Sequence, residues 1–111
     1  MAKTGRTKPN ELTSSWPDVP SDDPMGEMAR RFAVNLRAAM GDRGVREVAR
    51  TAGINHATLL SLLAGRTWAD FLTMARLETA LDARLWPGRV VVHGDPDGEH
   101  DVDYLLPDDL S

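Results

Sequence analysis

The sequence predicts an all-α protein. A compact helical domain is expected over residues 26–87, after a disordered N-terminal arm over residues 1–25 and before a strand-like segment and acidic tail over residues 88–111. In the central region, apolar residues recur at the three- and four-residue spacing of helices, and glycines interrupt each helical stretch. Only Arg89–His93, centred on three valines, has the pattern of a strand. A chain of 111 residues accommodates one such domain with its tails.

Composition and charge narrow the classes of function. The chain has no cysteine, which excludes disulfides, thiolate chemistry and cysteine-ligated metal centres. No leader pattern or apolar run of about 20 residues is present, so we expect a cytoplasmic protein. The net charge of −4 is unevenly spread: residues 26–86 hold nine arginines against six acidic residues, whereas residues 87–111 hold one arginine against seven. A basic centre is compatible with a nucleic-acid partner.

The outer segments give simpler predictions. Residues 1–25 contain four prolines among serine, threonine and aspartate, so order is expected there only if Trp16 docks onto the domain. The helix predicted over residues 26–40 carries an apolar stripe of Met28, Phe32, Leu36 and Met40. The helix predicted over residues 70–83 carries, at helical spacing, Phe71, Met74, Leu77 and Leu81. Leu85 and Trp86 close the domain, and Trp68 and Trp86 are expected to pack at its core or edge.

Two short helices at the centre form a helix-turn-helix. They are predicted over residues 45–52 and 56–64, and Gly53 makes the tight turn between them. Ala49 is small enough for the helices to cross nearly in contact, and Ile54 plugs the turn. Asn55 is a good N-cap for the second helix.

The stretch Val45–Arg66 reads V-R-E-V-A-R-T-A-G-I-N-H-A-T-L-L-S-L-L-A-G-R, which resembles the helix-turn-helix of the Cro/phage-repressor (XRE) family. The resemblance spans Phe32–Trp86, where the opening F-A-V-N-L-R and closing L-E-T-A-L-D-A-R-L-W-P look like actinobacterial members. It implies a compact bundle of four or five helices whose third helix enters the DNA major groove.

The resemblance also implies site residues. The side chains expected to face base edges are Asn55, His56, Ala57, Thr58 and Ser61. Those expected at phosphates are Arg46, Arg66 and Thr67, with Arg43 and Arg50 less well placed. Val45 stands where the family often has a phosphate-binding glutamine.

The outward face of the third helix predicts modest specificity. Ala57, Leu60, Ser61 and Ala64 point away from the core at 100° per residue, and none offers the bidentate base contact of Arg, Lys or Gln. The sequence predicts a transcriptional regulator, a repressor, that binds specific sequences of double-stranded DNA. Because one module alone discriminates weakly, we expect it to act as a homodimer. Antiparallel pairing of Arg89–His93 across a two-fold axis is the expected dimer contact.

Other interpretations stay open. A protein-interaction adaptor or antitoxin-like partner would use Leu60, Leu63 and the cluster Tyr104–Leu106, or the acidic tail. The tail would alternatively compete with DNA for the basic face. The run from His93 to Asp101 superficially resembles a calcium loop, but His93 and Tyr104 stand where acidic ligands are needed, so no metal is expected. No catalytic constellation or phosphate-binding glycine loop is found, so neither an enzyme nor a cofactor is expected.

Overall fold

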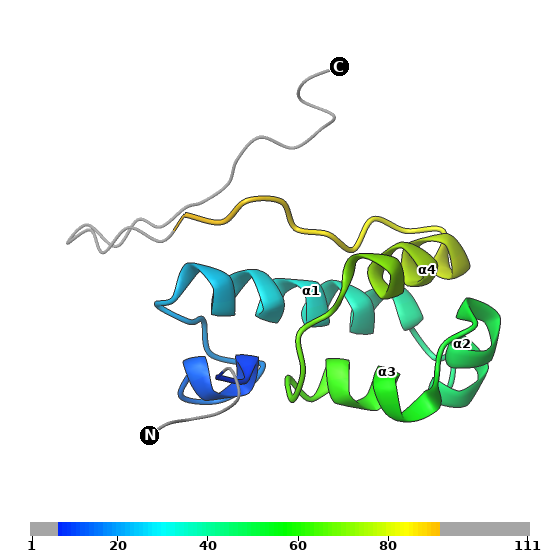
Figure 1. Ribbon diagram of the computed structural model, residues 1–111, viewed down its shortest axis with the longest axis horizontal. Coiled ribbons are helices and arrows are strands. Elements are labelled where there is room, and N and C mark those ends of the chain that lie inside the picture. Colours follow the sequence, from blue (N-terminus) through cyan, green and yellow to red (C-terminus); the bar gives the residue numbers. More distant parts are fainter. Residues whose placement is uncertain (1–6, 92–111) are drawn as a thin grey trace, which may run out of the picture.

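The computed structural model describes residues 7–91, and these form an all-helical, compact body (Figure 1). A short 3₁₀ helix, η1 (Pro9–Leu12), precedes α1 (Pro24–Met40), α2 (Val45–Ala52), α3 (His56–Leu63) and α4 (Phe71–Leu81). In Figure 1, α1 crosses the middle of the molecule with α3 below it, and α2 and α4 lie towards one end. No helix in residues 7–91 has the length and apolar character needed to cross a membrane.

Local signals set the helix bounds close to those predicted. The Asp23 carboxylate caps α1 by accepting from Met25 N and Gly26 N, and Asp70 caps α4 by accepting from Thr73 N. The helix α2 has the predicted bounds, whereas α4 ends at Leu81, two residues early, because Asp82 adopts a left-handed conformation with φ of 51°. The acidic Asp82 therefore ends α4 as a glycine usually would.

One core joins all four α-helices. Leu36 on α1, Leu59 on α3 and Leu77 on α4 are each 0% exposed. The predicted stripe of α1 is confirmed, since Phe32, Leu36 and Met40 are buried and Met28 is partly buried. Phe71 departs from its predicted stripe: it is 81% exposed, although Ala69 and Met74 on either side of it pack against the core.

The prediction of a disordered arm is wrong for residues 7–25. Residues 7–23, which precede α1 and are called the arm below, pack on α1 through η1. The arm lies directly against Gly26 of α1, where an added Cβ would come within 2.7 Å of Leu12 Cβ. Trp16 also docks: its Nε1 donates to Leu63 O at 2.9 Å. These contacts join residues far apart in the sequence, and composition does not register such contacts.

The predicted strand is not found in the part of Arg89–His93 that is described. Residues 89–91 have no regular structure, and Val90 is 4% exposed, so the segment lies on the body. Upstream, Glu78 Oε2 accepts from Leu85 N at 2.7 Å, and Asn35 Nδ2 donates to Leu85 O at 2.9 Å. In Figure 1 this segment runs along α1 on the side opposite α3. His93, Tyr104 and the acidic tail lie outside the described residues.

Candidate nucleic-acid interface

The turn between α2 and α3 holds the two helices in close contact. Ala49 is 2% exposed, as its predicted place at the crossing requires. Gly53 has φ of 73°, and its N–H donates to the carbonyls of Ala49 and Arg50. Arg76 of α4 donates from Nη1 to Gly53 O at 3.2 Å, so a third helix holds this turn in place.

The outward face of α3 carries small and apolar side chains. We call the surface formed by residues 55–58, 60 and 61 the α3 face. Ala57 and Leu60 are exposed on it, while His56, Thr58 and Ser61 are partly buried. The opposite side of α3 is buried through Leu59, Leu62 and Leu63. The predicted core positions are confirmed, and of the predicted outward positions Ala57 and Leu60 are exposed, whereas Ser61 and Ala64 are partly buried. The small outward side chains allow close approach of another surface.

Asn55 has a structural task at the start of α3. Its Oδ1 accepts from Ala57 N at 2.7 Å, which satisfies one of the N–H groups left open by the first turn. This cap uses one of the two acceptor lone pairs of Oδ1, so the two Nδ2 hydrogens and one Oδ1 lone pair remain for other partners. Asn55 therefore fulfils its predicted N-cap role, and the cap fixes the direction in which its side chain points.

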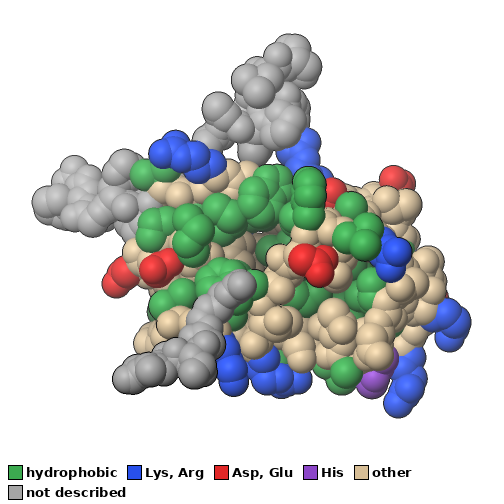
Figure 2. All heavy atoms as spheres, in the orientation of Figure 1, with side chains coloured by type: hydrophobic (Ala, Val, Ile, Leu, Met, Phe, Trp, Pro, Cys, Tyr) green, Lys and Arg blue, Asp and Glu red, His purple; other side chains and the backbone are tan. Residues whose placement is uncertain are grey.

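Four arginines beside the α3 face leave their charge exposed. Arg43 precedes α2, Arg46 and Arg50 lie on α2, and Arg66 follows α3. All four are exposed, and within residues 7–91 none of them forms an ion pair or a side-chain hydrogen bond. Figure 2 shows Lys and Arg side chains along the lower edge of the molecule, where α3 lies, and beside α2. The acidic side chains seen in this view lie elsewhere.

The other end of α3 is closed by a network that includes the arm. Gly65 has φ of 72°, and Arg66 N donates to Ser61 O at 2.9 Å. The next carbonyls receive donors from the arm: Asn10 Nδ2 donates to Ala64 O at 3.0 Å, and Asn10 N donates to Gly65 O at 2.9 Å. The arm thus fixes the exposed pair Arg66 and Thr67 relative to α3.

Sequence reasoning missed this contribution of the arm. The residues that dock are Asn10 and Trp16, and a Cβ at Gly65 would come within 2.5 Å of Trp16 Cε2. Trp68 Nε1 donates to Thr7 O at 2.8 Å, which holds the start of the described chain beside the loop after α3. The exposed Lys8 follows Thr7 and adds a cation at this end. The sequence offered one indication that the arm docks, which is the presence of Trp16 in a proline-rich segment.

The apolar surface that a protein-interaction adaptor would need is only partly exposed. Leu60 is 39% exposed, but Leu63 is 7% exposed and belongs to the core, so it is not available to a partner. The cluster Tyr104–Leu106 lies outside the described residues. Among residues 7–91, no group of three or more His, Asp or Glu side chains is arranged to hold a metal ion.

The chain matches no protein-family model, no curated protein and no solved structure. The resemblance to the Cro/phage-repressor family therefore depends on the residues of Phe32–Trp86 alone.

Proposed function

We propose that this protein binds double-stranded DNA, with α3 in the major groove, and acts as a transcriptional repressor. The observation that carries the proposal is the set of exposed arginines without ion-pair partners in residues 7–91, which lie before and on α2 and directly after α3, whose outward face is free. Arginines paired only with water attract the phosphate backbone and release its counterions.

The geometry supports phosphate contacts by one set of residues and base contacts by another. Arg46 on α2 and Arg66 after α3 contact phosphates on the two sides of the groove, with Arg43, Arg50, Thr67 and Lys8 available around them. The small side chains Ala57 and Ser61 let the α3 backbone approach the bases, and the methyl groups of Ala57 and Leu60 suit thymine C5-methyl contacts. His56, Thr58 and the Asn55 amide supply the hydrogen bonds to base edges.

The proposal includes a homodimer. One module with an eight-residue recognition helix and no bidentate base reader discriminates weakly between sequences. Two copies on half-sites about one helical turn apart multiply that discrimination. Because Val90 is buried on its own chain, the strand pairing expected for Arg89–His93 gains no support, and the dimer contact is left to other surfaces.

The test is fluorescence anisotropy on two labelled duplexes, one from upstream of the protein's own gene and one scrambled, at several salt concentrations. We expect preferential binding whose log–log salt slope falls by about 2 in the double variant Arg46→Ala/Arg66→Ala. Arg89→Ala, on the segment that lies across α1 from α3, is the control for the loss of one positive charge and is compared with each single variant, Arg46→Ala and Arg66→Ala.

Equal, weak binding to both duplexes, unaffected by the double variant, would contradict the proposal and favour a protein-interaction adaptor instead. In that event Leu60→Ala, rather than the arginine variants, would impair binding of the partner. The burial of Leu63 leaves that alternative with less apolar surface than the sequence suggested.

A further inference from the structure

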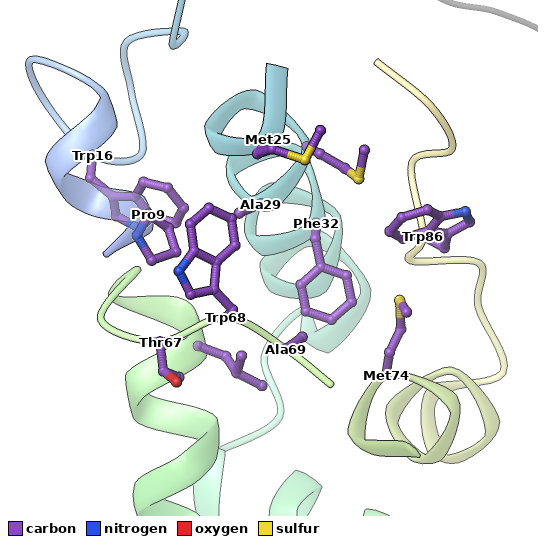
Figure 3. Close-up of a pocket in the computed structure, with 12 residues that line it drawn as sticks. Pro9, Trp16, Met25, Ala29, Phe32, Thr67, Trp68, Ala69, Met74 and Trp86 are labelled. Atoms are coloured by element: carbon purple, nitrogen blue, oxygen red, sulfur yellow. The ribbon is translucent and has the colours of Figure 1, made fainter. Parts of the chain in front are cut away.

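An apolar cavity of about 160 Å³ lies behind the loop that follows α3 (Figure 3). Its wall is assembled from the arm, α1, the core side of α3 through Leu62, the loop before α4, α4 itself and the C-terminal segment. Three tryptophans from separate parts of the chain, Trp16, Trp68 and Trp86, contribute to it. Apart from Thr67, none of the residues proposed to contact DNA lines this cavity.

The wall offers almost no polar group to an occupant. None of the residues that line the cavity is charged. The indole N–H groups of Trp16 and Trp68 are already bonded, to Leu63 O at 2.9 Å and Thr7 O at 2.8 Å. Thr67 supplies the one side-chain hydroxyl. A buried water needs two to four polar partners, so this space is poorly suited to ordered water.

The cavity is accessible from solvent. Met25 is 56% exposed and Trp86 is 44% exposed, and both line it. Figure 3 shows these two side chains on the side of the cavity away from Thr67. An unbranched methionine side chain has three rotatable bonds, so Met25 can move to admit a molecule without a change in the backbone.

We propose that this cavity binds a small, uncharged aromatic molecule. Its volume matches that of an apolar cavity which takes up benzene, so an occupant has about six to nine non-hydrogen atoms. Aromatic rings and methionine sulfurs make favourable contacts with a further ring, and the absence of charge in the wall excludes an ionic ligand. The ligand site is separate from the α3 face.

Toluene and indole are the probes, titrated into the full chain labelled with ¹³C at the methionine methyl groups. Met25, Met28 and Met74 line the cavity, so a bound ring should shift their signals through its ring current. Met40 is buried in the core and does not line the cavity, so its signal is the internal reference. We expect saturable shifts with a Kd on the order of 0.1–1 mM.

Ala29→Leu places a larger side chain in the α1 wall of the cavity and should weaken binding at least about tenfold. Ala38→Leu makes the same change at an exposed position of the same helix and should leave binding intact. If Ala29→Leu does not fold, as judged by the Met40 signal and thermal unfolding, Ala69→Leu fills the cavity from the loop instead.

Three results would overturn the proposal. They are the absence of saturable shifts in the full chain, shifts of Met40 as large as those of the cavity methionines, and unchanged binding in both cavity-filling variants. The titration contains no DNA, so its outcome is independent of the proposed DNA binding.

Discussion

Replacing Glu27 with glutamine should weaken the attachment of the arm to α1. The Glu27 side chain is 3% exposed. Its Oε1 accepts from Ser21 N at 2.8 Å, and its Oε2 accepts from Arg30 Nη2 at 2.7 Å and Arg31 Nε at 2.8 Å. Arg30 in turn donates from Nη1 to Pro17 O at 3.0 Å. One carboxylate therefore connects α1 to two points of the arm.

The size of the effect follows from the pKa of Glu27. Burial by itself raises the pKa, but the hydrogen bonds from Arg30, Ser21 N and Arg31, with the charge of Arg30, outweigh it and lower the pKa from 4.5 to about 2. A shift of this size corresponds to about 3 kcal/mol of stability at pH 7. Because the folded-state pKa is the lower one, this stability is present above pH 4.5 and is lost as the pH falls towards 2.

Urea unfolding followed by tryptophan fluorescence measures the effect, since Trp16 lies in the arm. We expect Glu27→Gln to lower the free energy of unfolding by about 2–4 kcal/mol at pH 7. Between pH 6 and pH 3, the native protein should lose about 2 kcal/mol more than the variant. Glu47→Gln is the control, because Glu47 is exposed on α2.

Two results would refute this reasoning. An unchanged urea midpoint in Glu27→Gln at pH 7 would show that the carboxylate does not hold the arm. A parallel pH dependence in the native protein and the variant would show that the pKa of Glu27 is not lowered by its arginine partners.

Three further predictions concern how the outer segments are fixed. Gly65→Ala should lower the free energy of unfolding by about 2–4 kcal/mol, and Gly53→Ala by about 1 kcal/mol, because both glycines have positive φ but only Gly65 faces Trp16. Equal losses of stability in thermal unfolding would show that Trp16 does not pack on Gly65. Trp16→Phe removes the donor to Leu63 O and should cost about 1 kcal/mol in urea unfolding, whereas a neutral change would make that hydrogen bond dispensable. Asn35→Ala leaves the Leu85 carbonyl without this donor, so amide exchange near Leu85 should accelerate by about tenfold; unchanged protection would rule the contact out as an anchor.

The helices and their ends were predictable because their causes are local. Apolar spacing predicted the buried residues of α1, and Asn55 and Gly53 predicted where α3 begins and α2 ends. A cap satisfies N–H groups two or three residues away, so the residues next to a helix end are enough to predict where that end lies. The outward positions of α3 followed from the same periodicity. The exposure of Phe71 was not predictable, since it depends on which side chains near the start of α4 meet the core, and these are Ala69 and Met74.

The sequence by itself determined the four α-helices, the turn at Gly53 and the division of α3 into buried and outward sides. Only the tertiary structure decided that the arm is ordered and that Val90 lies on the body instead of forming part of a strand. The physical reason is the distance along the chain between partners: Trp16 bonds a carbonyl 47 positions away, and Asn35 bonds one 50 positions away. Composition and periodicity describe what a segment does with its neighbours, whereas docking depends on a surface that exists only after the helices have packed.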